Sequence, residues 1–319
     1  MFRFYHFSKA SRENAKEPND LLTWSINLIS EFFGTIFISI AFAGLSILIN
    51  GRKLGSYMLN DVVVGFYAGF AVIGPASLFF GHWSADMNPI NSIYKIINGR
   101  DTVLYGMSKI IVQFFGGISA GLMIYTIGTW TNDGNAANIA ISAVEVAKKD
   151  FLKWNDTGQS ALIGGSGWIF FGELTVAAIF LFPSFTPRLN GRNEKYRTIM
   201  KMFIFSLCVW TGSLIGSTAI NPARGLAQQI PALFFGIKDG STLHGQTDLI
   251  LSTIFLVLGG CFAPLFYALV QGFTETYFNP LINKIFYYHN RSKLFMISNK
   301  DKLKLKKNKK NINNKQKYE

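Results

Sequence analysis

Long apolar runs separated by short polar connections dominate the pattern of the chain. Six of these runs reach the length of about 20 residues that a helix needs to cross the hydrocarbon core of a bilayer. They cover residues 23–49, 60–80, 103–128, 166–185, 199–217 and 249–273. The pattern predicts six transmembrane helices and therefore an integral, multi-pass membrane protein.

Two shorter stretches of helical character start at Asn88-Pro89 and at Asn221-Pro222. Asparagine is a good N-cap, and proline suits the first helical position. Each stretch follows a span and is too short to cross again, so we expect two re-entrant half-helices whose N-termini meet near the midplane. Irregular backbone at that depth requires surrounding protein or a water-filled cavity, which indicates a pore. A third Asn-Pro pair, at 279–280, is expected only to start a cytosolic helix after the sixth span.

The chain repeats in two halves. Glu31 in the first span and Glu173 in the fourth lie 142 residues apart, and Asn88 and Asn221 lie 133 apart. Three spans per half is an odd number, so the second half is inverted relative to the first. The expected organisation is a cytosolic N-terminal segment (1–22), a first repeat (23–128), an extracellular loop (129–165), a second repeat (166–273) and a basic cytosolic tail (274–319).

Charge is distributed unevenly around a net value of +13. The connections on one side hold 23 of the 31 lysines and arginines, whereas those on the other side hold seven. The positive-inside rule therefore predicts that both termini are cytoplasmic. The lysine-rich C-terminal tail reads as a solvated segment near anionic lipid rather than as a nucleic-acid arm, so no nucleic-acid partner is expected.

Composition offers little for catalysis or metal binding. Two cysteines, Cys208 and Cys261, both fall inside predicted spans, which favours neither a disulfide framework nor a paired-cysteine metal site. No nucleophile and base pattern is apparent either. We expect no enzyme activity, no metal and no cofactor.

Several motifs together resemble the aquaporin and glycerol-facilitator (major intrinsic protein) family. They are "SEFFGT" at 30–35, "NPI" at 88–90, "GMSKIIVQFFGGISAG" at 106–121, "FFGEL" at 170–174 and "INPARG" at 220–225. The resemblance covers about residues 23–273. It implies an all-α membrane fold with six transmembrane helices and two re-entrant half-helices in an inverted repeat. It also implies a homotetramer of passive channels that pass water and small neutral solutes and exclude protons and ions. The plasma membrane is the default location.

The same resemblance assigns roles to individual residues. The pore midplane would be formed by Asn88, Pro89, Ile90, Asn221, Pro222 and Ala223. Gapless counting from each asparagine gives the selectivity filter as Ala68, Val209, Thr218 and Arg224. The residues that support the re-entrant loops would be Glu31, Glu173 and Gln113.

The residues of the expected filter indicate which solutes could pass. Ala68 and Val209 would leave a wide, partly apolar constriction that suits glycerol. A shift of one residue would bring in Tyr67 or Trp210 instead, which would favour a strictly water-selective channel.

Three positions depart from the family pattern. Ile90 is larger than the usual alanine and would narrow or repack the midplane. Asp86 stands where a histidine is usual and is expected to alter the cytoplasmic vestibule, and Gly225 stands where glycerol facilitators have aspartate. Two functions of other classes also stay open. One is an ion-coupled transporter that would use Glu31 and Glu173, and the other is a non-conducting adhesion protein.

Overall fold

The computed structural model describes residues 4–8, 10–58, 60–134, 136–148, 158–185, 194–217, 219–236 and 245–290. The chain divides into two compact units. Residues 4–268 form one unit, and the other consists of residues 1–3 together with 269–319, of which 269–290 are described. The basic tail from residue 291 onward lies outside the described residues.

Within the described part of the chain, six helical segments are long and apolar enough to cross a membrane. They are Leu21–Ser46, Val62–Phe80, Val103–Thr131, Gln159–Phe185, Tyr196–Ile215 and Gly245–Asn290. Each one overlaps a span predicted from the sequence. The largest differences are that the fourth begins seven residues earlier, at Gln159, and that the sixth continues to Asn290. The predicted set of six spans is confirmed.

The elements of the first half precede the long loop after α6. In chain order they are η1 (Ala10–Arg12), α1 (Leu21–Ala43), η2 (Gly44–Ser46), β1 (Leu48–Ile49), β2 (Arg52–Lys53), α2 (Leu54–Met58), α3 (Asp61–Phe66), η3 (Tyr67–Ile73), α4 (Gly74–Phe80), α5 (Pro89–Ile97) and α6 (Val103–Thr131). The strands form a small antiparallel hairpin. Its turn is Asn50-Gly51, with both φ angles positive, as a tight hairpin turn requires.

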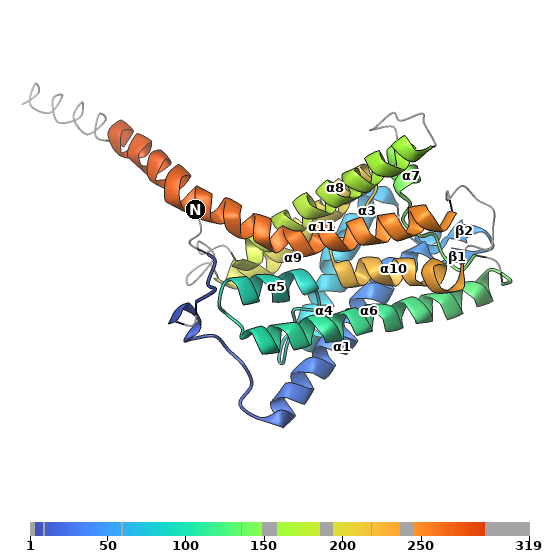
Figure 1. Ribbon diagram of the computed structural model, residues 1–319, viewed down its shortest axis with the longest axis horizontal. Coiled ribbons are helices and arrows are strands. Elements are labelled where there is room, and N and C mark those ends of the chain that lie inside the picture. Colours follow the sequence, from blue (N-terminus) through green and yellow to red (C-terminus); the bar gives the residue numbers. More distant parts are fainter. Residues whose placement is uncertain are drawn as a thin grey trace, which may run out of the picture. The chain divides into compact units, whose positions relative to one another are not determined.

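The second half contains α7 (Ala143–Lys148), α8 (Gln159–Phe185), α9 (Glu194–Ile215), α10 (Pro222–Phe235), α11 (Gly245–Phe273) and η6 (Thr274–Phe278). Figure 1 shows α5 and α10 lying end to end beside the long helix α6. These two helices are only 9 and 14 residues long. They are the two half-helices that the Asn-Pro pairs predict.

Polar side chains cap the N-termini of two spans, α1 and α6. Asp20 caps α1 by accepting a hydrogen bond from the Thr23 backbone N–H at 2.8 Å. Hydrogen bonds from the side chain and backbone of Thr23 hold the pKa of Asp20 below its ordinary value. Thr102 caps α6 in the same manner, with 3.3 Å from its hydroxyl to the Tyr105 nitrogen. Such caps satisfy backbone donors at the helix ends, which would otherwise be costly near the bilayer.

Paired glycines let the helices of each half approach closely. A Cβ on Gly116 of α6 would lie 2.9 Å from the Phe32 carbonyl oxygen of α1, and one on Gly259 of α11 would lie 2.5 Å from the Phe170 oxygen of α8. Small residues at such crossings allow the close packing that holds helices together in lipid, where hydrophobic burial contributes little. The two glycines lie 143 residues apart and mark a second element of the internal repeat.

Residues 269–290 continue as helix beyond the last apolar stretch. The π-helical segment η6 follows α11 directly and leads into a helix over 279–290. Asn279 has φ −63° and ψ −43°, so it lies inside a continuous helix, and the predicted helix start at 279–280 is wrong. The wider π turn ends at Phe278, two residues before Pro280, whose missing N–H cannot complete a regular helical turn.

Candidate functional site: two capped half-helices below an open cavity

The two asparagines begin the half-helices as expected from their sequence context. The side-chain oxygen of Asn88 accepts from the Ile90 backbone N–H at 3.1 Å at the start of α5. The oxygen of Asn221 accepts from the backbone N–H groups of Ala223 at 3.0 Å and Arg224 at 3.3 Å at the start of α10. Each asparagine thereby satisfies backbone donors that a helix leaves open at its first turn.

The amide nitrogens of the same asparagines connect the two halves. Nδ2 of Asn88 donates to the Ile220 carbonyl oxygen at 3.1 Å, and Nδ2 of Asn221 donates to the Met87 carbonyl oxygen at 2.8 Å. Met87 and Ile220 are the residues just before each asparagine, and both have positive φ, at 47° and 53°. This conformation is unusual for a β-branched residue such as isoleucine and indicates strain that the surroundings must hold. Sequence reasoning missed this reciprocal pair of contacts.

Glu31 holds the loop that leads into α5. Its carboxylate accepts from the backbone N–H groups of Asp86 at 2.8 Å and Met87 at 2.6 Å, from the Ser84 hydroxyl, and from Nε2 of Gln113 at 2.8 Å. Glu31 and Gln113 are fully buried. These are the contacts that a loop-supporting role requires of both residues.

Glu173 makes the equivalent contacts in the second half. It accepts from the backbone N–H groups of Ala219 at 2.9 Å and Ile220 at 2.8 Å, and from the Ser217 hydroxyl. In each half, the carboxylate therefore binds the residue with positive φ that precedes the asparagine. The inverted repeat extends from the spacing of the sequence to individual hydrogen bonds.

A buried ion cluster surrounds the first half-helix. Lys109 of α6, 1% exposed, contacts Asp86 at 2.5 Å and also pairs with Asp101. Lys95 of α5 contacts the other oxygen of Asp86 at 2.6 Å, and Ser92 donates to Asp86 at 3.1 Å. Asp86 and Asp101 flank α5, so the cluster ties both ends of the half-helix to α6. Asp86 was expected to alter the vestibule, but it is buried and paired with two lysines.

A cavity of ≈360 Å³ lies beside the start of α10. Three of the four predicted filter residues, Ala68, Val209 and Arg224, line it together, while Thr218 lies outside the described residues. Its lining also contains Phe42, Leu45, Ser46, Lys53, Gly55, Ser56, Val64, Tyr67, Phe205, Ser213, Ala219 and Gln228. The wall therefore combines aromatic and aliphatic surface with two cations, hydroxyls and one amide.

The structure distinguishes Tyr67 from Trp210, the two residues that a one-residue shift would bring into the predicted filter. Tyr67 lines the cavity together with Ala68, and its hydroxyl donates to the Ala41 carbonyl oxygen at 3.0 Å. Together with Val64 they have the i, i+3, i+4 spacing of one helix face. Trp210 is not among the lining residues and packs edge-on against Phe66 at 5.0 Å between ring centroids.

Two departures from the family pattern have a packing explanation. Ile90 is fully buried in a cluster that combines Ala177, Ala178 and Ala263 of α8 and α11 with larger residues such as Tyr94 and Leu181. Gly225 has no room for a side chain, because a Cβ there would lie 2.3 Å from a methyl group of Leu256.

Two of the other residues predicted to form the pore midplane pack on glycines. Pro222 lies against Gly260 of α11, where a Cβ would come within 2.6 Å of the proline ring. The Ala223 carbonyl lies against Gly117 of α6, where a Cβ would come within 2.3 Å of the oxygen. Pro89 is buried at the first position of α5. Both neighbours of α10 thus provide glycines where the second half-helix begins.

The electrostatics of the site follow from the opposed half-helices. Each helix N-terminus carries a partial charge of roughly +0.5, so two positive ends face each other at the asparagines. Arg224, buried in the first turn of α10, adds a full positive charge beside the cavity. Among the residues that the structure describes, no group of three or more His, Cys, Asp or Glu side chains could hold a metal ion. The arrangement suits recognition of polar, uncharged molecules rather than cations.

Comparison with known proteins agrees with this geometry. No family model matches the chain. Aquaporin C of Dictyostelium discoideum is 26% identical over 127 residues, which is 40% of this chain and 46% of that protein. The X-ray structure of the aquaglyceroporin from Plasmodium falciparum matches with a TM-score of 0.53 and 14% identity, covering 82% of this chain and 99% of that chain.

Six spans and two half-helices in an inverted repeat define an integral, multi-pass membrane protein. The structural match shows that the fold is that of an aquaglyceroporin, which confirms the predicted fold class. The local sequence similarity to aquaporin C agrees with the resemblance that the motifs carry.

Proposed function

We propose that the chain is a passive transmembrane channel for water and small neutral solutes, with glycerol among them. The observation that carries this proposal is the pair of capped half-helices joined tip to tip through Asn88 and Asn221. Half-helices that end inside a membrane are tolerated where they line a water-filled path. The cavity beside α10 provides an entrance to such a path.

Exclusion of ions and protons follows from the same elements. The two helix N-termini and Arg224 create positive potential where a permeating molecule must pass, which repels cations and hydronium. Each asparagine amide carries two N–H groups, of which one is bound to the opposite half. The other can donate to a passing water and orient it, which interrupts a proton-conducting chain of waters.

The mixed lining of the cavity supports glycerol as a solute. Phe42, Val64 and Val209 offer surface for a carbon backbone, while Ser213, Arg224 and Gln228 offer partners for hydroxyl groups. A strictly water-selective channel is the second candidate, and it is favoured by the ring of Tyr67 at the same cavity.

An ion-coupled transporter is less well supported. Glu31 and Glu173 would have to release and bind a coupling ion, yet both carboxylates are committed to backbone N–H groups of the re-entrant loops. If either carboxylate turned away to bind an ion, the buried backbone N–H groups would lose their acceptors, which is costly.

The setting of the channel forms part of the proposal. Both termini face the cytoplasm, consistent with the excess of lysine and arginine on that side. Large apolar side chains such as Phe33, Phe115 and Phe171 are exposed on the spans and would contact lipid or neighbouring subunits of a homotetramer. The plasma membrane is the proposed location, and no enzyme activity is expected.

Stopped-flow light scattering on proteoliposomes tests this function. Vesicles with the protein should shrink faster than empty vesicles in an impermeant osmolyte and re-swell faster in a glycerol gradient. Fast shrinkage with glycerol excluded would select the water-selective candidate. Rates equal to those of empty vesicles in both gradients would refute the channel.

A further inference from the structure

The face of α9 that lines the cavity continues below the predicted filter. Ser213, Val209 and Phe205 follow one another at intervals of four residues, which keeps them on one side of a helix. All three line the cavity. Phe205 lies one turn beyond Val209, and it is not one of the positions that counting from the asparagines assigns to the filter.

Phe205 is held between aromatic rings from both halves of the repeat. Its ring stacks on Phe42 of α1 with 5.5 Å between centroids and an interplanar angle of 23°. On α8, Phe180 meets it edge-on at 5.4 Å and 80°. Stacked and edge-on pairs at these distances are favourable arrangements, so the ring has a defined resting position.

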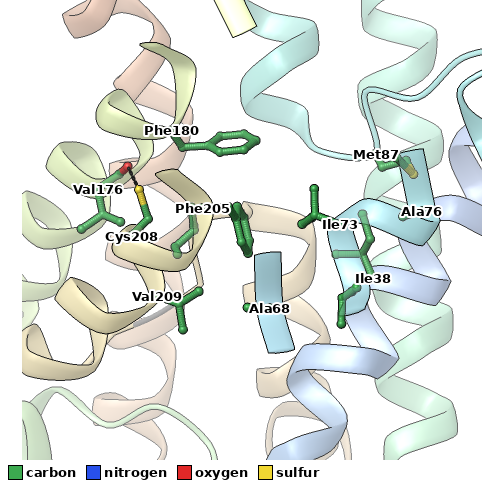
Figure 2. Close-up of a cluster of buried hydrophobic side chains, with 12 residues drawn as sticks. Ile38, Ala68, Ile73, Ala76, Met87, Val176, Phe180, Phe205, Cys208 and Val209 are labelled. Atoms are coloured by element: carbon green, nitrogen blue, oxygen red, sulfur yellow. Dashed lines mark hydrogen bonds between the residues drawn. The ribbon is translucent and has the colours of Figure 1, made fainter. Parts of the chain in front are cut away.

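The position of Phe205 links the cavity to the midplane. Phe42 and Phe205 line the cavity, whereas Phe180 belongs only to the buried cluster beyond it. That cluster also includes Met87 and Ile220, the residues that precede the two asparagines. Figure 2 shows Phe180 and Phe205 extending from α8 and α9 toward the side of the first half that carries Ile73 and Met87. Phe205 therefore belongs both to the cavity lining and to the cluster that holds these two residues, as do the smaller Ala68 and Val209.

We propose that Phe205 is the residue that limits the size of the permeating solute, one helical turn inside the predicted filter. This inference rests on the proposed channel function and deepens it. The small side chains at Ala68 and Val209 leave the filter wide, and the aromatic pair of Phe205 and Phe42 supplies the narrowing instead. The width of the gap beside the Phe205 ring then sets which solutes permeate, and it favours water and slender linear polyols over bulkier ones.

The test measures permeability ratios in proteoliposomes, because a ratio does not depend on the amount of active protein. Phe205→Ala removes the ring, and Phe205→Leu keeps an apolar side chain if the alanine variant folds poorly. Phe203→Ala is the matched control, since this phenylalanine of the same helix is 47% exposed. Val209→Ala enlarges the predicted filter directly. Water, glycerol and a bulkier polyol such as xylitol are compared for each protein.

We expect Phe205→Ala to raise the glycerol-to-water ratio several-fold and to admit xylitol, with Phe205→Leu intermediate and Phe203→Ala unchanged. Ratios for Phe205→Ala and Phe205→Leu equal to that of Phe203→Ala would overturn it, most clearly if Val209→Ala alone changed selectivity. Flux at the level of empty vesicles in every variant would instead refute the channel function itself.

Discussion

Replacement of Glu173 by glutamine tests how the second re-entrant loop is held. The two carboxylate oxygens accept from the backbone N–H groups of Ala219 and Ile220 and from the Ser217 hydroxyl. A glutamine retains one acceptor oxygen and turns an NH₂ group toward a backbone donor. A buried donor left without an acceptor costs about 1–3 kcal/mol. The remaining bonds lose their charge assistance, so the total should be about 3 kcal/mol.

The position of Ile220 implies that losing the Glu173 hydrogen bond also affects water permeation. Its positive φ is held partly by its N–H bond to Glu173, and its carbonyl receives the amide of Asn88. Loosening this bond should therefore disturb the junction of the two half-helices. We expect Glu173→Gln to lower both the free energy of unfolding and the water permeability per protein.

Titration with SDS in mixed micelles, followed by circular dichroism, measures the change in unfolding free energy. The matched control is Glu145→Gln on α7, where the half-exposed carboxylate pairs with Lys148 at 3.3 Å. An exposed pair of this kind contributes about 0–1 kcal/mol. If both variants unfolded at the same SDS fraction, the reasoning about Glu173 would be refuted.

Two further substitutions test the packing around the half-helices. Lys109→Met removes the central cation of the buried cluster at α5 and should destabilise the protein by about 3 kcal/mol, whereas Lys148→Met on the surface should have little effect in the same SDS titration. Gly117→Ala forces a methyl group toward the Ala223 carbonyl and should cost about 1–3 kcal/mol and reduce water flux. Gly167→Ala on α8 meets nothing within 4 Å and should be neutral or slightly stabilising; equal effects of the two glycine variants would contradict the packing argument.

Most of the fold could be predicted from local sequence patterns. An apolar run of about 20 residues, long enough as a helix to cross the hydrocarbon core, has few alternatives to a transmembrane helix. The six spans could therefore be predicted from the sequence. Asn88 and Asn221 likewise combine a cap with a following proline, which specifies a helix start within a few residues. The pair at 279–280 looks the same locally, yet it lies in a continuous helix, because the preceding π turn accommodates the proline.

Contacts between distant segments could not be predicted in the same way. Lys109 and Asp86 are 23 residues apart on different elements, and no local pattern indicates that they pair. Counting from the asparagines gives one residue at each filter position, so it offered Ala68 and Tyr67 as alternatives, whereas both line the cavity. The aromatic contacts of Phe205 depend on three helices at once.

The most direct test of the central claim measures water and proton flux in the same proteoliposomes. Vesicles loaded with a pH-sensitive dye are exposed first to an osmotic gradient and then to a pH gradient, with Asn221→Asp as the comparison. This variant loses the N–H that binds the Met87 carbonyl and introduces a negative charge between the half-helices. We expect the wild-type protein to speed water flow without proton leak above empty vesicles, and Asn221→Asp to impair water flow or admit protons. Wild-type vesicles that shrink no faster than empty ones, or that pass protons together with water, would contradict the account.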